Sequence, residues 1–232
     1  RNICWICAPF AIGAVLVSGT LTGRAAKNGL TLDQVLSNMH AASLKLHTVG
    51  ARITQQRYNT DLGGKPDLYQ GEIYMDHKPS CDKIRMWYSA NNEVYQDVLV
   101  ECEKIKLYQP RTKQVIVTTR SKQASKDPQY DFLATPYSSV SSLKTRYKIE
   151  YAGDEPVNGS PAARLNLTPF KASPVKRIVL WIDQKTWIPV QYQFIEDSTT
   201  TTFTLNDVKM NQGLRGDIFT QKTAPGTKEV KQ

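Results

Sequence analysis

The sequence predicts a mainly β protein in which roughly eleven strands form an antiparallel meander behind one N-terminal helix. From Val49 onward, apolar and polar residues alternate with period two, and β-branched and aromatic residues are frequent. Short turn sequences such as Asp61-Leu62-Gly63-Gly64 and Asn158-Gly159 separate these runs. A sheet of this many twisted strands has to curl into a barrel or a sandwich to bury one face.

The predicted strands share this alternation and end at polar turns. They are expected near residues 49–59, 68–77, 84–90, 94–100, 105–109, 114–118, 145–152, 162–169, 177–182, 188–196 and 200–210. In the strand 188–196, Val190, Tyr192 and Phe194 share one face and are candidates for the inside of the sheet. Alternation alone does not tell whether such a stripe lines a cavity or fills a solid core.

One helix is expected before the strands. Thr31 and Gln34 have the spacing of a capping box, in which each side chain bonds the backbone of the other residue. The apolar residues from Leu32 to Leu46 follow the three-and-four spacing of one helical face. The sequence therefore predicts an amphipathic helix that packs on the sheet.

The segment 121–144 interrupts the strands. Its first half is polar, and the apolar residues that follow, among them Tyr130, Phe132, Leu133, Val140 and Leu143, have the spacing of a short helix. Loops of this length inside a compact domain are often functional, so a movable helical lid is one interpretation. A short helix that packs against one end of the barrel is the other.

Composition and charge point to one folded, exported domain. The 232 residues contain no visible linker, and 40% of them are hydrophobic. The net charge of +9 is spread over the chain instead of forming a basic block, which favours a solvated surface first and weak attraction to a membrane or partner second. We expect no nucleic-acid partner.

Residues 1–26 differ from the rest. No charged residue occurs between residues 3 and 21, and Gly23 and Ala25 have the spacing that a signal peptidase recognises. The sequence predicts a signal peptide, with an uncleaved N-terminal anchor as the alternative because the apolar run is about long enough to span a bilayer. The domain then comprises residues 27–232.

Cys81 and Cys102 are the two cysteines of this domain, and export would allow them to form a disulfide. Around a tight turn at Asn91-Asn92, residues whose numbers sum to 183 face each other, which pairs these two cysteines. A longer turn or a bulge would shift the register, so two unrelated thiols remain the alternative.

Catalytic and metal-binding patterns are missing from the sequence. It contains no G-x-S-x-G, H-E-x-x-H or glycine-rich phosphate-binding motif, and its three histidines have no neighbouring pair of ligand residues. We therefore expect a protein that is not an enzyme and that holds no metal and no cofactor.

The order of motifs resembles the LolA family of outer-membrane lipoprotein carriers over most of the chain. The fragments that carry the resemblance are, in order, the helix 31–46 with Ala51-Arg52-Ile53-Thr54-Gln55, Gly71-Glu72-Ile73-Tyr74 with Lys78-Pro79, Ile84-Arg85-Met86-Trp87-Tyr88, Leu107-Tyr108-Gln109-Pro110 with Gln114-Val115, Leu165-Asn166-Leu167-Thr168-Pro169, and Phe219 with Pro225-Gly226. The resemblance implies an incomplete, half-open antiparallel β-barrel, capped by the N-terminal helix and a short helical lid, whose apolar interior shelters acyl chains.

The resemblance also implies site residues. Under this interpretation our candidates for the lining of the lipid-binding cavity are Met86, Trp87, Val190, Tyr192, Phe194 and Phe203, with ordinary core packing as the alternative for each. By the family pattern, Lys78 stands where an arginine usually latches the lid, and Arg85 is the other latch candidate. Lysine lacks the forked donors of a guanidinium group, so this departure predicts a looser latch or one moved to Arg85.

The function implied is that of a monomeric periplasmic chaperone that moves acylated lipoproteins from the inner to the outer membrane. Its partners would be an ATP-driven extraction complex of the inner membrane and an acceptor in the outer membrane. The alternative is an envelope sensor of lipids or lipoproteins that uses the same fold to regulate a membrane partner. An uncleaved N-terminal anchor would favour the sensor.

Overall fold

The computed structural model describes residues 29–78, 80–90, 93–122, 129 and 140–232. The helices and strands of this part are α1 Leu32–Ser43, β1 Thr48–Asn59, β2 Asp67–Asp76, β3 Lys83–Ala90, β4 Glu93–Glu101, β5 Lys104–Gln109, the short 3-10 helix η1 Pro110–Thr112, β6 Gln114–Thr119, α4 Val140–Arg146, β7 Tyr147–Asp154, β8 Ala162–Pro169, β9 Arg177–Asp183, β10 Pro189–Ile195, β11 Thr199–Met210 and β12 Lys228–Lys231. Among these residues, no helix has the length and apolar character needed to cross a membrane.

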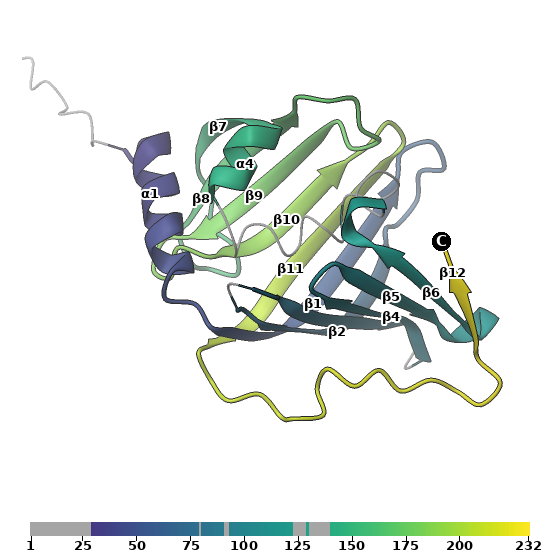
Figure 1. Ribbon diagram of the computed structural model, residues 1–232. Helices are drawn as coiled ribbons and strands as arrows, with labels where there is room; N and C mark the ends of the chain where they lie inside the picture. Colours follow the sequence, from purple (N-terminus) through teal and green to yellow (C-terminus); the bar gives the residue numbers. More distant parts are fainter. Residues whose placement is uncertain (1–28, 79, 91–92, 123–128, 130–139) are drawn as a thin grey trace, which may run out of the picture.

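A single twelve-stranded sheet makes up the body of the protein (Figure 1). Its strand order is β12-β6-β5-β4-β3-β2-β1-β11-β10-β9-β8-β7, so the first and last long strands, β1 and β11, meet in the middle. The pairs are antiparallel except β12 with β6, which is parallel. The sheet does not close: β7 and β12 are its two edges, which makes the fold a half-open barrel.

The sheet curls because its ladders contain local irregularities. The register shifts between Gly50 and Arg52 in β1 and between Tyr88 and Ser89 in β3, and bulges of this kind bend a strand and increase its twist. Next to the second shift, β2 approaches β3 so closely that a Cβ atom on Gly71 would lie 1.7 Å from the carbonyl oxygen of Trp87. Glycine is therefore required at this bend.

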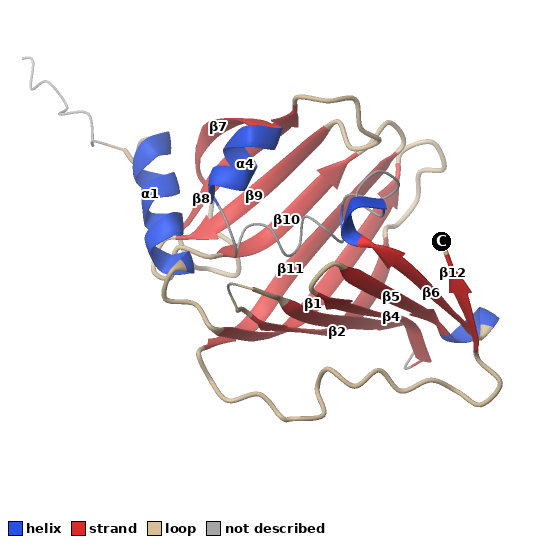
Figure 2. Ribbon diagram, viewed as in Figure 1, coloured by secondary structure: helices blue, strands red, loops and turns tan. Residues whose placement is uncertain are grey.

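Both described α-helices lie on the concave face of the sheet (Figure 2). Helix α1 begins with the predicted capping box: Gln34 N donates to Thr31 Oγ1 at 3.3 Å, and Thr31 N donates to Gln34 Oε1 at 2.8 Å. Its apolar side buries Val35, Leu36 and Met39 against the sheet. Helix α4 contacts α1 and β7.

The main hydrophobic core lies between these helices and the concave face. Strand alternation supplies it, since every second residue of each strand points inward, as the buried Ile84, Met86 and Tyr88 of β3 do. A smaller core of Val157, Ala162, Val179 and Trp181 lies on the convex face.

The fold agrees with the prediction of a mainly β, half-open barrel, and three details differ. Helix α1 ends at Ser43 instead of continuing to Leu46. The seventh strand starts at Tyr147, because residues 140–146 form α4. Strand β12 was not predicted, since its four residues are all exposed and carry no alternation. Residues 1–26 and the predicted lid residues Tyr130, Phe132 and Leu133 lie outside the described part.

Cys81 and Cys102 form a disulfide bond, with their Cα atoms 4.4 Å apart. The expected register was wrong by one residue over most of the hairpin, because a bulge with Tyr95 of β4 as its extra residue shifts the ladder and pairs Lys83 with Glu101. The cysteines lie just outside the paired strands. Cys102 sits in the β4–β5 turn with a φ of 54°, and this turn brings its side chain back towards Cys81.

We expect the double variant Cys81→Ser/Cys102→Ser to unfold with a free energy lower by about 3 kcal/mol, because the bond closes a loop of 21 residues in the unfolded chain. Urea unfolding followed by tryptophan fluorescence measures this difference. Reductant should lower the wild-type value to that of the variant and leave the variant unchanged. Equal stabilities of oxidised wild type and variant would contradict the prediction.

Candidate functional site

A cluster of aromatic side chains occupies the middle of the concave face. Phe203 of β11 is at its centre, with its ring 5.8 Å from that of Phe194 in an edge-to-face arrangement and 6.4 Å from that of Tyr88. Both geometries are favourable for aromatic pairs. The hydroxyl of Tyr88 donates to the sulfur atom of Met86 at 3.4 Å. The cluster is thus apolar and polarisable, with the Tyr88 hydroxyl turned to a sulfur.

The strand register explains why these residues meet. Tyr192 of β10 pairs with Phe203, and Gln55 of β1 pairs with Phe203 from the other side. Directly paired residues have side chains on the same face of a sheet. Residues that come from separate hairpins of the chain therefore form one continuous apolar surface.

The concave surface is covered in this structure. Tyr192 and Phe194 have no exposed area, and Phe203 is 1% exposed. Part of the cover is Met39 of α1 and Leu143 of α4, which belong to the same core. An acyl chain can reach these aromatic residues only after part of the cover moves.

The chemistry of the concave surface suits hydrocarbon and little else. Its buried hydrophobic residues are Val, Leu, Ile, Met, Ala, Phe and Tyr, and the buried Thr201 lies beside Phe194 on the same face. Each methylene group moved from water to such a surface gains about 0.8 kcal/mol. Among the described residues no group of three His, Cys, Asp or Glu side chains is arranged to hold a metal ion.

Of the six predicted lining residues, the structure brings Met86, Tyr192, Phe194 and Phe203 together on the concave face. Trp87 lies on the convex face, stacked on Tyr74 with ring centroids 5.5 Å apart. The prediction for Trp87 was wrong because neighbours in a strand point to opposite faces. Strict alternation would have selected Tyr88, which is 2% exposed.

Val190 is the second correction. The ladder between β9 and β10 shifts register between Pro189 and Gln191, and this bulge takes Val190 out of the alternation of its strand. Val190 packs instead on the convex cluster that contains Val179 and Trp181. Nothing in the sequence marks this bulge.

Residues 123–128 and 130–139 of the expected lid lie outside the described part, so a latch between Lys78 and the lid stays a prediction. Lys78 is mostly exposed, and its ammonium group lies 3.4 Å from the carboxylate of Asp76 in the same segment. Arg85 lies on the convex face, away from α1 and α4, because it alternates with Ile84 and Met86. The expectation for Arg85 is therefore replaced by a different role.

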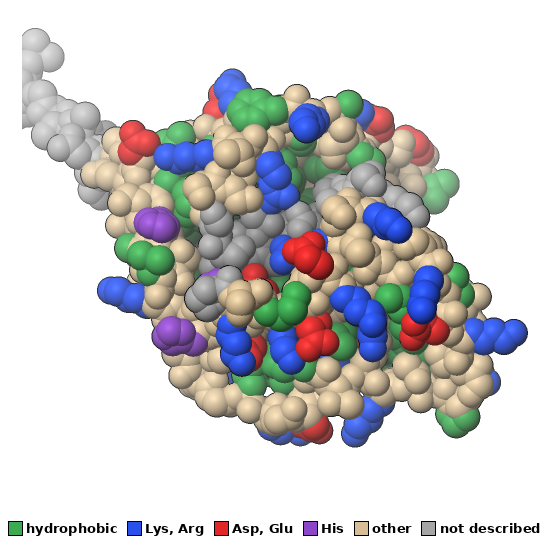
Figure 3. All heavy atoms as spheres, in the orientation of Figure 1, with side chains coloured by type: hydrophobic (Ala, Val, Ile, Leu, Met, Phe, Trp, Pro, Cys, Tyr) green, Lys and Arg blue, Asp and Glu red, His purple; other side chains and the backbone are tan. Residues whose placement is uncertain are grey.

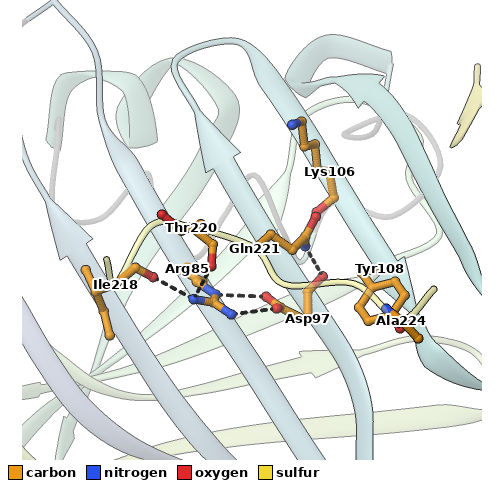
Figure 4. Close-up of polar contacts among 8 residues, drawn as sticks. All are labelled: Arg85, Asp97, Lys106, Tyr108, Ile218, Thr220, Gln221 and Ala224. Atoms are coloured by element: carbon orange, nitrogen blue, oxygen red, sulfur yellow. Dashed lines mark hydrogen bonds and ion pairs between the residues drawn. The ribbon is translucent and has the colours of Figure 1, made fainter. Parts of the chain in front are cut away.

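Arg85 binds the C-terminal strap, which we define as residues 211–227 between β11 and β12 (Figure 4). Its Nη1 donates to the carbonyl oxygens of Ile218 and Thr220 at 2.8 and 2.9 Å, while Nε and Nη2 donate to the carboxylate of Asp97. The guanidinium group also lies 4.9 Å from the centre of the Trp87 ring. The guanidinium group thus makes four hydrogen bonds and one cation–π contact.

Two further bonds fix the strap. The Gln221 side chain donates to the carbonyl oxygen of Asp97 at 2.9 Å, and Ala224 N donates to the hydroxyl of Tyr108 at 3.0 Å (Figure 4). Burial and the nearby Glu72 carboxylate raise the pKa of Tyr74, a convex-face neighbour of Arg85. This polar docking surface comes from residues that are distant in sequence, so single-sequence patterns do not reveal it.

The convex face also carries pockets, and they differ in kind from the concave surface. One of about 350 Å³ is bordered by Arg52, Asp207 and Lys185, and one of about 450 Å³ lies between the strap and the strands, with Glu101 and Lys106 at its wall. Charged walls suit polar solutes and water better than acyl chains.

We expect Arg85→Gln to lower the free energy of unfolding by about 3 kcal/mol or more, because Asp97, whose side chain is 6% exposed, would keep a buried charge without its cation. The matched control is Arg52→Gln, which breaks the exposed ion pair with Asp207 and should cost less than about 1 kcal/mol. Urea unfolding gives both values. The same small loss for both variants would show that the strap does not depend on Arg85.

The comparisons with known proteins follow the geometry. The model of the family described as outer membrane lipoprotein carrier protein LolA matches residues 45–222. The half-open barrel with an apolar, helix-covered concave face defines the class of protein, and the match over most of the chain defines the family. This chain belongs to the LolA family. No curated protein matches it in sequence.

Solved structures share the fold at low sequence identity. An uncharacterized conserved protein from Thermus thermophilus has a TM-score of 0.55 at 8% identity, over 86% of this chain and 98% of that one. MucB has a TM-score of 0.50 at 13% identity, over 82% of this chain and 62% of MucB. A LolA superfamily protein from Nitrosomonas europaea has a TM-score of 0.41 at 13% identity, over 83% and 98%. At these low identities, the TM-scores of 0.55 and 0.50 show a shared fold and no more.

Proposed function

We propose that the protein is a periplasmic carrier that binds the acyl chains of lipoproteins on its concave face and moves them from the inner to the outer membrane. The observation that carries the proposal is the apolar surface around Phe203, built from both halves of the sheet and covered by helices. Membership of the LolA family, whose description is that of a lipoprotein carrier, supports it. Binding of acyl chains to an apolar surface requires no nucleophile, metal or cofactor.

The covered state has a physical role in this proposal. An empty apolar surface of this size is costly in water, and the helices α1 and α4 remove it from solvent. Acyl chains replace the helix side chains on the sheet. The net free energy of binding is therefore the difference between the contact of the sheet with the acyl chains and its contact with the helices. A modest difference allows the carrier both to load and to release its cargo.

The proposed route needs two partners, an ATP-driven extraction complex in the inner membrane and an acceptor in the outer membrane. A carrier of this kind works as a monomer and has no enzymatic activity of its own. The predicted signal peptide, residues 1–26, would bring it to the periplasm.

A regulatory sensor is the second candidate. The fold is shared with MucB, which has also been solved in complex with MucA, so a sheet of this kind can take a protein as its partner. A sensor would stay anchored by residues 1–26, while a carrier has to leave the membrane. Sequencing of the N-terminus of the protein isolated from cells separates the two. A start near residue 26 supports the carrier, and an intact segment 1–26 in the membrane fraction supports the sensor.

Photo-crosslinking from two neighbouring glutamines tests the proposed site. Gln55 lies on the concave face opposite Phe203, and Gln56 is the next residue, on the convex face. We expect benzoylphenylalanine at position 55 to form adducts with the acyl chains of a triacylated lipoprotein, because the chains lie within its reach. The same group at position 56 should form none. Mass spectrometry of the digested adducts gives the measurement.

The two positions are adjacent glutamines of the same strand and differ only in the face of the sheet on which they lie. The variant at position 56 therefore controls for effects on expression and for random contact with lipid. Adducts from position 56 alone, or equal yields from both, would contradict a concave binding site. Native mass spectrometry of the wild-type protein should in addition show a co-purified acylated species.

A further inference from the structure

One end of the sheet carries most of the exposed apolar side chains of the described structure. We call it the hairpin end: it is formed by the last residues of β1, β3, β8 and β10 and the first residues of β2, β4, β9 and β11. Eight large hydrophobic residues of the described part are exposed, and six of them lie at this end. These six are Tyr58, Leu62, Leu68, Val94, Tyr95 and Phe170.

The register shows that these residues belong to one end. Asn59, next to Tyr58, pairs with Thr199 at the start of β11, and Ile195 at the end of β10 pairs with Arg177 at the start of β9. The connection between β8 and β9 contains Phe170. In Figure 1 the β1–β2 hairpin, the β10–β11 turn and the β8–β9 connection lie together at the upper right.

The apolar side chains stand out individually. Leu62 is 84% exposed and Phe170 is 63% exposed. Leu62 is followed by Gly63 and Gly64, both with positive φ, and a Cβ atom added to either would meet no atom within 4 Å. The β1–β2 tip is thus a narrow projection that presents an exposed leucine.

Two tyrosines complete the pattern. Tyr58 is 38% exposed and Tyr95 is 42% exposed, and the Tyr95 ring lies 5.0 Å from that of Tyr69 in β2. Tyrosine combines an apolar ring with a polar hydroxyl, and this combination is favoured at the interface between lipid headgroups and hydrocarbon.

The charge of the hairpin end is balanced. Its basic residues are Arg57, Lys65, Lys171, Lys176 and Arg177, and its acidic residues are Asp61, Asp67, Glu93, Glu196 and Asp197. Figure 3 shows both colours mixed with hydrophobic side chains along the upper right of the molecule. These ten charges cancel, so the exposed apolar side chains of the hairpin end carry no net charge of their own, while the adjacent β5–β6 turn and the start of β7 contribute Arg111, Lys113 and Arg146.

We propose that the hairpin end is a membrane-contact surface that inserts Leu62, Phe170 and their apolar neighbours into the interface of a lipid bilayer. Separate projections on several hairpins fit a deformable lipid surface, while a protein partner would need a matching socket for each. Balanced charge means that the contact is driven by apolar burial, so it does not require anionic lipid. This inference concerns the bilayer and does not depend on cargo binding.

The experiment is co-sedimentation of residues 27–232 with vesicles of palmitoyl-oleoyl-phosphatidylcholine, after circular dichroism has shown that each variant is folded. We expect the wild type to bind, and Leu62→Ser/Phe170→Ser to bind with a partition coefficient lower by at least about tenfold, since two apolar side chains no longer enter the lipid. Adding about 0.5 M salt should leave wild-type binding nearly unchanged.

Leu44→Ser is the matched control, because Leu44 is 70% exposed but follows α1, at the other end of the sheet. We expect this variant to bind like the wild type. Three outcomes would each overturn the proposal. They are failure of the folded wild type to bind the vesicles, equal loss of binding in both variants, and binding that requires anionic lipid and disappears in salt. The vesicles contain no lipoprotein, so this result is independent of the crosslinking experiment on the carrier site.

Discussion

Strict alternation of side chains along a curved, open sheet is the constraint on which the rest of this protein depends. It makes the concave face apolar over most of the strands, while the convex face is largely polar apart from the small cluster around Val179 and Trp181, and the curl turns the apolar face into a trough. Helices α1 and α4 pack into this trough, because their own apolar sides can share its large apolar surface. The candidate site is therefore a property of the whole sheet.

The two faces of the sheet are stabilised by different kinds of interaction. On the concave face, stability comes from apolar contact around Phe203, which is unspecific and permits exchange with a lipid chain. On the convex face, the Arg85–Asp97 pair and its carbonyl partners fix one arrangement of the strap by directional bonds. In the proposed carrier, the surface for acyl chains and the surface that holds the strap thus lie on opposite faces of the same sheet.

Much of the fold could be predicted from the sequence, and the reasons are local. The capping box at Thr31 and the alternation from Val49 onward depend on neighbours in the chain, so they are visible in one sequence. Four lining residues followed from the same alternation and the family resemblance. Trp87 was misplaced because alternation was not applied strictly, and Val190 because a bulge interrupts it. The strap and β12 depend on contacts between distant residues, which no local pattern encodes.

The position of the strap along the chain affects the order of assembly. Arg85 contacts Ile218, which follows it by 133 residues, and β6 pairs with β12, where Gln114 meets Lys228. Asp97 and the edge of β6 therefore remain open to water while the chain emerges, and they are covered only when its final residues have arrived. Until the strap and β12 dock, the six-residue β6 is the edge strand; afterwards the edge is the four-residue β12, which carries Lys228 and Lys231, and a chain cut short before Ile218 would keep β6 as its edge.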